Sequence, residues 1–513
     1  MKLRILSARR ALAVAIVFAT LVLAAASASA KKPPPDGGGS GGGFSTTSTY
    51  VKNYANVLNG IEYSLTPEDV QASPDGGWTA LAITSTTPEL SWLLKASAVG
   101  GPQWQEEIGC LNGAPGDYAD GVSLRQTSDG GYVLAGGTIG CGSGRDCPEL
   151  SGLQCGLIEK LDGTGALLWA RVYSAGAYGT GIQQISPTSD GGFVAVGTAT
   201  DANHNTGALI LKLDGLGNVQ WARELGPAGT SQAYFTAVRQ TADGGYVAAG
   251  ELDTDTYSGT GLPLISVLAV KFDAGGNVSW QRGFNDVGST GVTATEHVIA
   301  IVQTADGGYA IGGSWDSGTN AYGSCCTGAL LLKLTPNGSI QWQTAYSGGV
   351  TCADQSCARI GGVVYSLHQT ADGGYILAGD AASQQFSLTP WLAKVDGNGA
   401  LVWQENDYQV LASTGAPLSE YFASSTFTAT GPLAIGPTEN YSKGLNELLA
   451  VQTDANGNVG TCSQIHPATA LAATNPGLAP LATGLTATTN AVSQSSSPVQ
   501  VRPTSGTASA SQC

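Results

Sequence analysis

The chain has 513 residues, of which 73 are glycine and only 12% are charged, a composition that excludes a coiled coil or a charged helical protein and favours a turn-rich β protein. Its formal net charge of −16 disfavours nucleic acid and anionic lipid as partners. The length suffices for several ordinary domains or for one large repeat architecture.

The first 30 residues are predicted to be a secretory signal peptide. Basic residues at positions 2, 4, 9 and 10 precede an apolar run at 11–25, and Ala28-Ser29-Ala30 provides a small-residue cleavage site. Its removal leaves 18 Lys and Arg against 38 Asp and Glu, a net charge of −20. Arg9-Arg10 leaves the twin-arginine route open beside general secretion. No later stretch is long and apolar enough to cross a bilayer, so we expect an exported protein, periplasmic, cell-surface or extracellular, without direct membrane insertion.

One phrase then recurs along the chain. Residues 31–48 are rich in Pro, Gly and Ser and are expected to be a linker. Beyond them, QTADGGYVAAG (240–250) has relatives whose first Asp lies at 75, 129, 190, 306 and 372. A second phrase, as in KLDGTGALLW (160–169), follows each copy with a Lys and a Trp at fixed spacing, and a degenerate seventh copy occupies 429–436 and 451–461. Residues 49–462 therefore hold seven repeats of one structural unit.

Each repeat is predicted to form four antiparallel strands. Asp-Gly favours a two-residue hairpin in which both central residues take positive φ, and the apolar phrase after it is typical of a strand packed on both faces. Four strands at a spacing of 53–66 residues predict an all-β fold, a seven-bladed β-propeller. TYVKNYAN (49–56) resembles a fourth strand and is expected to complete the last blade. The DGG is then a structural turn, the Trp residues pack between blades, and the repeated Lys reaches a carboxylate or carbonyl.

All variation in repeat length falls in the loops after the second and fourth strands, which share one face of a propeller. We call it the long-loop face and expect function there. Eight Cys lie in these loops, in two groups: Cys110, Cys141, Cys147 and Cys155, and Cys325, Cys326, Cys352 and Cys357. An even number of Cys in an exported chain predicts disulfides, with the pairing inside each group left open. Their spacing matches no standard zinc pattern.

The end of the chain, residues 463–513, is rich in Ala, Thr, Ser and Pro and almost uncharged. Two stretches, TGLTATTNAVSQ and SPVQVRPTSG, could form strands, which predicts a β-rich C-terminal extension. Cys462 and Cys513 bracket it and are expected to pair, closing a loop that packs on the edge of the propeller. A disordered or glycosylated stalk is the alternative.

Candidate binding residues are carboxylates, aromatic residues and a histidine in or beside the long loops: Asp146, Glu149, Tyr257, Asp286, Glu296, His297, Trp315, Asp316, Tyr322 and Asp354. Asp253 and Asp255 are spaced like the start of a calcium loop, but no carboxylate stands at the usual closing position. The adjacent Glu296 and His297 form a pair without a placed nucleophile, which favours a structural role over catalysis. No catalytic residue is predicted, and no cofactor is expected unless calcium binds at this loop.

Residues 49–462 resemble secreted bacterial and archaeal propeller proteins built from QTxDGGYxxxG and KLDxxGNxxW repeats, a family mostly of unknown activity. The phrase KLDGTGALLW is also distantly similar to the repeat of quinoprotein propellers, which include calcium- and quinone-dependent dehydrogenases and non-enzymatic assembly scaffolds. The adjacent Cys325 and Cys326 resemble the vicinal disulfide of some of those dehydrogenases. Their calcium-binding carboxylates and catalytic Asp have no counterpart that we can place in this sequence.

Two functions remain open. The first is an exported, non-catalytic scaffold, expected to be monomeric, that binds a protein, a glycan or a surface polymer through the long-loop face. The second is a secreted enzyme, a quinoprotein-like oxidoreductase or a carboxylate-based hydrolase or lyase, with its site at the channel mouth of the same face. Carboxylates and an Arg that converge at the mouth would favour the enzyme, and a flat or aromatic-rimmed face would favour binding.

Overall fold

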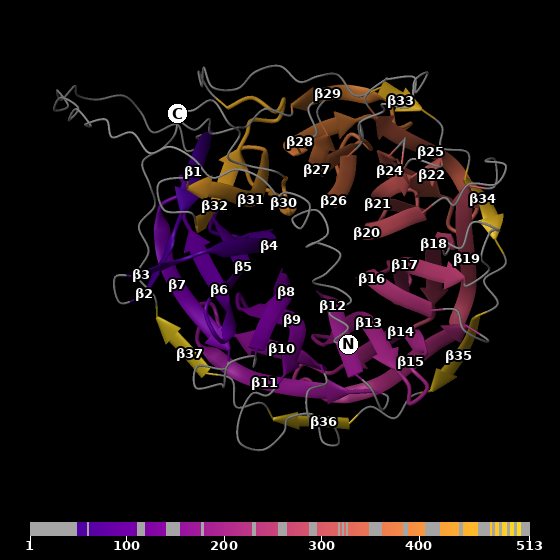
Figure 1. Ribbon diagram of the computed structural model, residues 1–513, viewed down its shortest axis with the longest axis horizontal. Coiled ribbons are helices and arrows are strands. Elements are labelled where there is room, and N and C mark those ends of the chain that lie inside the picture. The colour runs from indigo at the N-terminus through magenta and orange to yellow at the C-terminus, as the bar shows by residue number, and fades with distance from the viewer. Residues whose placement is uncertain are drawn as a thin grey trace. The chain divides into compact units, whose positions relative to one another are not determined.

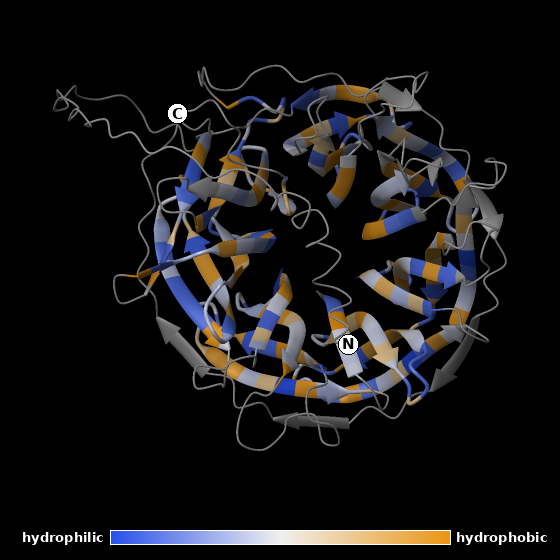
Figure 2. Ribbon diagram, in the orientation of Figure 1, coloured by the Kyte–Doolittle hydropathy of each residue, from blue (hydrophilic) through white to orange (hydrophobic). Residues whose placement is uncertain are grey.

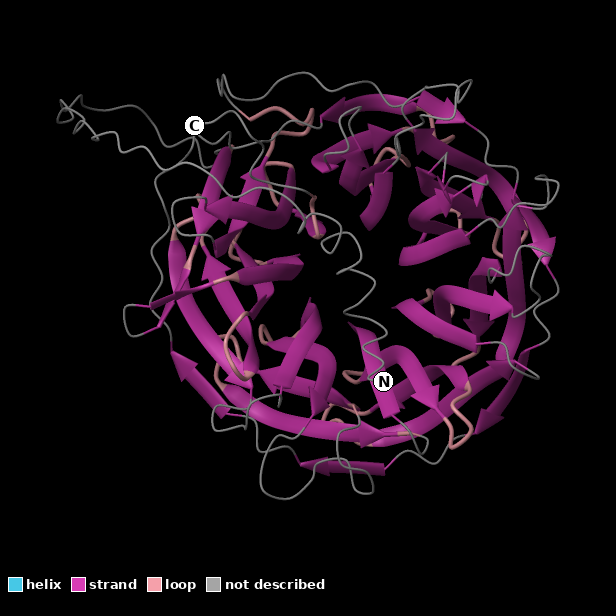
Figure 3. Ribbon diagram, in the orientation of Figure 1, coloured by secondary structure: helices cyan, strands magenta, loops and turns pink. Residues whose placement is uncertain are grey.

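The computed structural model describes residues 49–58, 61–109, 118–139, 154–175, 179–227, 232–254, 264–286, 295–316, 319–320, 323–324, 327–347, 362–382, 388–405, 421–440, 445–459 and five short strands between 472 and 503. The chain divides into Met1–Ser45 and Thr46–Cys513, and every described residue belongs to the second unit. The expected signal peptide (1–30) and linker (31–48) lie outside the described residues. The described part is all-β and has no helix (Figure 3).

None of the described residues forms a helix long and apolar enough to span a membrane.

The second unit contains seven blades of four antiparallel strands each, which form a meander in blades 1 to 6 and are completed by the N-terminal strand in blade 7 (Figure 1). Blade 1 consists of β4 (Leu65–Ala72), β5 (Trp78–Thr84), β6 (Glu89–Ala96) and β7 (Pro102–Gly109). Blade 2 consists of β8 (Tyr118–Gln126), β9 (Tyr132–Ile139), β10 (Cys155–Leu161) and β11 (Leu167–Ser174). Blade 3 consists of β12 (Gly179–Pro187), β13 (Phe193–Thr200), β14 (Thr206–Leu213) and β15 (Val219–Pro227). Blade 4 consists of β16 (Gln232–Gln240), β17 (Tyr246–Thr254), β18 (Leu264–Phe272) and β19 (Val278–Asp286). Blade 5 consists of β20 (Thr295–Gln303), β21 (Tyr309–Asp316), β24 (Thr327–Leu334) and β25 (Ile340–Ser347). Blade 6 consists of β26 (Gly362–Gln369), β27 (Tyr375–Ala382), β28 (Leu388–Val395) and β29 (Leu401–Glu405). Blade 7 consists of β30 (Ser424–Phe427), β31 (Pro432–Asn440), β32 (Leu445–Gln452) and β1 (Tyr50–Tyr54).

The blades form a closed ring. The first strands contact one another in the cyclic order β4, β8, β12, β16, β20, β26, β30 and back to β4. As expected from the sequence, the N-terminal strand β1 pairs with β32 and completes blade 7. Its Tyr54 donates a hydrogen bond to Gly100 O (2.7 Å), as Tyr173 and Tyr346 of true fourth strands do to Gly217 O and Gly399 O (2.8 Å each). The first and last repeats are therefore joined by main-chain hydrogen bonds, which removes two exposed sheet edges.

The core lies between neighbouring blades, because successive side chains of the second strands are buried on opposite faces. Figure 2 shows hydrophobic residues in the strands of every blade. In β9, Tyr132 and Leu134 pack in the cluster shared with blade 1, whereas Val133 and Ala135 pack in the cluster shared with blade 3. This alternation is the period of two that a strand imposes on its side chains. The repeated small and apolar phrase after each DGG therefore supplies both inter-blade cores.

The DGG turn differs from the expected two-residue hairpin. In blade 2, Gly130 N bonds Thr127 O (3.0 Å) and Thr127 N bonds Gly131 O (2.9 Å), which closes a three-residue loop. Only Gly130 has a positive φ, 81°, so Asp129 avoids the left-handed region that is costly for it. The Asp129 carboxylate instead accepts hydrogen bonds from Thr127 Oγ1 and Gly131 N (3.0 Å). The structural role predicted for the turn is confirmed, and its loop length was wrong by one residue.

The other repeated residues join the strands and the blades. Lys160 has a buried stem, and its Nζ lies 2.9 Å from both Asp129 Oδ2 and Leu161 O, as predicted for the Lys column. Five of the six repeated Trp pack edge-on against the aromatic residue after the next blade's DGG, as Trp104 does with Tyr132 at 6.0 Å between ring centroids. The Gln of the phrase accepts a backbone N–H from the preceding blade: Gln240 from Ser189, Gln303 from Ala242 and Gln369 from Ala305 (2.7–2.8 Å).

The C-terminal extension adds a fifth strand to five blades, in reverse order around the ring (Figure 1). The pairs are β33 (Ala472–Thr474) on β25, β34 (Leu478–Leu481) on β19, β35 (Leu485–Thr489) on β15, β36 (Ser493–Ser496) on β11 and β37 (Gln500–Pro503) on β7. This agrees with a β-rich segment on the propeller edge and disagrees with a free stalk. Two small hairpins complete the described strands: β2 (Asn56–Leu58) with β3 (Ile61–Tyr63), and β22 (Thr319–Asn320) with β23 (Gly323–Ser324).

Candidate functional site

The first strand of each blade lies nearest to the ring axis (Figure 1) and carries the most variable polar residues of the repeat. In blades 1 to 6 this strand contains a β-bulge, which leaves one residue out of register and re-aims the side chains around it. The residues just after the bulge form one level around the axis, which we call the clasp level: Asp69, Ser123, Gln184, Ala237, Ala300 and Ser366, with Ser424 in blade 7.

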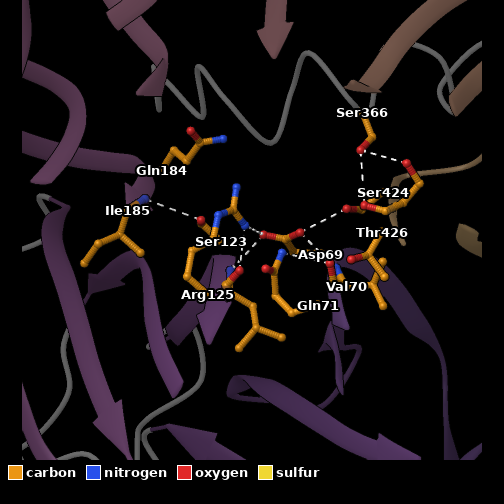
Figure 4. Close-up of polar contacts among 12 residues, drawn as sticks. Asp69, Val70, Gln71, Ser123, Arg125, Gln184, Ile185, Ser366, Ser424 and Thr426 are labelled. Atoms are coloured by element: carbon orange, nitrogen blue, oxygen red, sulfur yellow. Dashed lines mark hydrogen bonds and ion pairs between the residues drawn. The ribbon is translucent and has the colours of Figure 1, made fainter. Parts of the chain in front are cut away.

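Asp69 connects three blades at the clasp level (Figure 4). Its Oδ2 accepts hydrogen bonds from Leu124 N (2.9 Å) and Arg125 Nη1 of blade 2. Its Oδ1 accepts from Ser424 Oγ of blade 7 (2.9 Å) and from the adjacent Val70 N (2.9 Å). The Asp69 side chain is 10% exposed, and its carboxylate accepts hydrogen bonds from four donors. It joins the first blade to the second and to the last.

Gln184 repeats this arrangement between blades 3 and 4. Its Oε1 accepts hydrogen bonds from Val238 N (2.8 Å) and from Arg239 Nη1 (2.6 Å). Arg239 Nη1 also donates to Val238 O (2.7 Å), just as Arg125 Nη1 donates to Leu124 O (2.6 Å). The two arginines are thus held alike, but Arg125 faces a carboxylate and Arg239 faces a neutral amide.

Smaller side chains complete the level. Ser123 Oγ accepts a long hydrogen bond from Ile185 N (3.4 Å), and Ser425 Oγ donates to Ser366 Oγ (3.0 Å) between blades 7 and 6. His368 Nε2 donates to Ser425 O at 2.7 Å. Burial lowers the pKa of His368 to about 4, and the positive charges of Arg239 and Arg125 lower it further. This imidazole is therefore neutral at physiological pH.

A second group lies nearer the long-loop end of the axis, where blades 4 and 5 meet. The buried Glu251 Oε2 accepts a hydrogen bond from Tyr234 Oη and lies 3.2 Å from His297 Nδ1. The His297 side chain is 38% exposed. A carboxylate bonded to one imidazole nitrogen fixes the orientation of the ring and leaves the other nitrogen for a ligand.

A third group consists of carboxyls of blades 1 and 2: Asp120 and Glu89 lie at the same end, and Glu159 lies further along β10, level with Leu124. Burial raises the pKa of Asp120 to about 7, and the charges of Glu89 and Glu68 add to this effect. Burial together with Asp120 raises the pKa of Glu159, which is 1% exposed, to about 8. These groups carry fewer charges near neutral pH than their number suggests. Within the described residues, no group of three or more His, Cys, Asp or Glu could hold a metal ion.

The structure places part of the predicted set. Glu296 and His297 lie in β20, but the partner of His297 is Glu251, from another blade, and Glu296 is fully buried opposite Trp315. Asp253 lies in β17, and Asp286 and Asp316 end their strands. Cys155 is buried at the start of β10. The other candidates lie outside the described residues: Cys110, Cys141, Cys147, Cys325, Cys326, Cys352, Cys357, Cys462, Cys513, Asp146, Glu149, Asp255, Tyr257, Tyr322 and Asp354.

The polar side chains of the first strands, which lie near the ring axis, were not predicted from the sequence, although a sequence pattern indicates them. Four residues before the Asp of DGG, otherwise similar repeats carry different residues: Gln71, Arg125, Ser186, Arg239, Val302 and His368. All of them pair in register with the residue four after the same Asp, so they share one level of the ring. Comparing the repeats at this position would have found the charges near the axis.

The comparisons with known proteins add little. No protein-family profile and no curated protein matches the sequence. Among solved structures, a protein of unknown function from Bacteroides caccae is 13% identical over 64% of this chain and 93% of its own, with a TM-score of 0.33. A subtype N11 neuraminidase-like protein of A/flat-faced bat/Peru/033/2010 (H18N11) is 12% identical over 65% and 89%, also at 0.33. A thermostable family-43 glycoside hydrolase is 9% identical over 78% and 91%, at 0.31. Scores this low carry no argument about activity.

Proposed function

We propose that this chain is an exported, non-catalytic binding scaffold that holds a glycan or a glycan-containing surface polymer on its long-loop face. One observation carries the proposal: the blades are alike at the turn end and differ at the long-loop end. At the turn end, the Asp of DGG forms an ion pair with the repeated Lys in blades 1 to 6 and accepts a hydrogen bond from the Thr two residues before it in blades 2 to 6. At the other end, Glu251 with His297 and Asp120 with Glu68 and Glu89 occur in single copies.

The chemistry of these groups suits hydroxyl-rich ligands. The exposed imidazole of His297 offers one nitrogen beyond the one that Glu251 engages. Carboxyls such as Asp120 and Glu89, which are half-buried, accept hydrogen bonds from sugar hydroxyls. Adjacent blades present these groups on paired strands, whose backbone is already ordered, which limits the entropy lost on binding.

The test is a binding screen of the purified full chain against neutral and acidic polysaccharides, followed by His297→Asn. We expect this substitution to weaken binding of the selected polymer by about tenfold, the effect of about one hydrogen bond to a charged or polar partner. The matched control is His204→Asn, because His204 is an exposed histidine with φ of 64° that asparagine tolerates. Equal loss in both variants, or no polymer bound at all, would contradict the proposal.

One observation favours a second function, a carboxylate-based hydrolase. Asp120 has a pKa of about 7 and lies beside other carboxylates, the division of protonation states that general acid–base hydrolysis uses. The two functions differ in the fate of the ligand. A scaffold returns the polymer intact after prolonged incubation, whereas a hydrolase releases new reducing ends that disappear in Asp120→Asn.

A further inference from the structure

A pair of arginines lies close to the ring axis at the turn end, away from the long-loop groups. Arg125 and Arg239 occupy the same register position in the first strands of blades 2 and 4, opposite Val133 and Val247. Blade 3, between them, carries the short Ser186 at this position, opposite Val194. The two guanidinium groups therefore flank a position with little side-chain bulk.

Their charges are not equally compensated. The Arg125 side chain is 13% exposed and forms an ion pair with Asp69. Arg239 is half-buried, and the oxygen of Gln184 occupies the place that the Asp69 carboxylate takes for Arg125. Among the described residues no carboxylate forms a salt bridge with Arg239. One positive charge is thus held near the axis by neutral acceptors only.

The surroundings make this charge costly. Burial lowers the pKa of Arg239 to about 9, and the charge of Arg125 contributes in the same direction, opposed by Asp69. The neighbouring His368 is neutral at physiological pH and adds no further positive charge. A half-buried charge without a counter-ion destabilises a fold, and a bound anion would remove that cost.

Both arginines keep hydrogen-bond donors that an oxyanion could use. In both arginines, every hydrogen bond to the described residues is made by Nη1. A guanidinium has five N–H groups arranged in a planar fork that matches carboxylate, phosphate and sulfate oxygens. The unused edges of two guanidinium groups on either side of a serine can together hold a tetrahedral anion.

We propose that Arg125 and Arg239 form a binding site for a small free oxyanion of the phosphate or sulfate class at the turn end of the ring axis. This site is separate from the glycan site at the long-loop end. In a chain whose net charge is −16, a local excess of positive charge provides the attraction that the rest of the surface lacks.

The experiment measures phosphate and sulfate binding to the full chain by calorimetry and by thermal shift, with chloride at equal ionic strength as the reference. Arg239→Gln is expected to weaken phosphate binding by about tenfold or more, the loss of a charge-assisted hydrogen bond. Arg223→Gln is the matched control: Arg223 lies over Trp221 on a fourth strand and bonds Gly275 O. The Arg223→Gln variant should bind phosphate with the same affinity as the unmodified chain.

Gln184→Glu keeps the test decisive if Arg239→Gln does not fold. It places a carboxylate against Arg239 as Asp69 stands against Arg125, so it should raise the melting temperature without anion and abolish the rise caused by phosphate. Absence of phosphate and sulfate binding in the unmodified chain would overturn the proposal. Unchanged affinity in both Gln184→Glu and Arg239→Gln would overturn it as well.

Discussion

Replacing Asp69 by alanine tests whether the clasp level stabilises the ring. The change removes an acceptor from two backbone N–H groups, one hydroxyl and the Arg125 guanidinium. Breaking a buried pair by removing one partner costs about 3–5 kcal/mol, because the remaining charge is left without compensation. Since Asp69 also joins blades 1, 2 and 7, we expect the free energy of unfolding to fall by this amount.

Urea denaturation followed by tryptophan fluorescence measures the effect, with Asp201→Ala as the control. Asp201 also accepts two backbone N–H groups, from Asn203 and Asn205 (2.8 and 2.9 Å), but in an exposed turn, so its loss should matter far less. The double variant Asp69→Ala, Arg125→Ala should recover part of the loss, because no charge is then left unpaired. If Asp69→Ala costs less than about 1 kcal/mol, or if the two substitutions are additive, the clasp does not hold the ring as argued.

Three further predictions concern the repeat and the buried carboxyls. Gly245→Ala places a Cβ 2.3 Å from Phe272 O and should lower the melting temperature markedly, whereas Gly226→Ala, which has open space, should leave it unchanged. Burial alone would raise the pKa of Asp190, but hydrogen bonds from Lys212, Thr188 and Gly192 outweigh it and lower that pKa to about 2. The stability from this pair is present above the ordinary Asp pKa and should be lost as the pH falls towards 2, and Asp190→Asn should flatten the acid limb of a stability-against-pH curve. The pKa of Glu159 is shifted in the opposite direction, to about 8. Its contribution to stability is present below the ordinary Glu pKa and is lost as the pH rises through 8. The Glu159→Gln variant should therefore resist alkaline unfolding better than the unmodified chain.

The blade architecture was predictable because local chemistry repeats. The DGG turn and the Trp strand show the same short-range preferences in six copies. A strand or turn that is poorly predicted in one repeat can therefore be identified from the equivalent residues of the other repeats. The predicted loop length of the turn was wrong because a two-residue hairpin requires positive φ at both Asp and Gly. In the structure the Asp side chain caps the turn, as Asp129 does for Gly131 N, and this favours a conformation with only glycine in the left-handed region.

The site was less predictable because its contacts cross the sequence. Glu251 meets His297 across 46 residues, and Asp69 meets Ser424 across 355. Neither distance leaves a local pattern, so Glu296, the chain neighbour of His297, was taken as its partner. The extension shows the same limit: TGLTATTNAVSQ could be read as strands, but the edges that β35 and β36 join exist only once the ring has formed.

The division of the axis into two ends follows from the repeat itself. At the turn end the Asp and Lys of blades 1 to 6 bond one another, and in blades 4 to 6 the Gln accepts a backbone N–H from the preceding blade, so a substitution of that Gln disturbs two blades at once. At the long-loop end, Tyr234, Asp120 and His297 occupy the same register level of the first strand in three blades, so the ring forms with a different side chain there in each of them. Arg239 is the exception, a charged residue at the constrained end held by a neutral partner. Other blades carry Gln71, Ser186, Val302 or His368 at this position, so the ring closes without an arginine there. An anion bound by Arg239 and Arg125 would offset the cost of the charge that Gln184 leaves uncompensated.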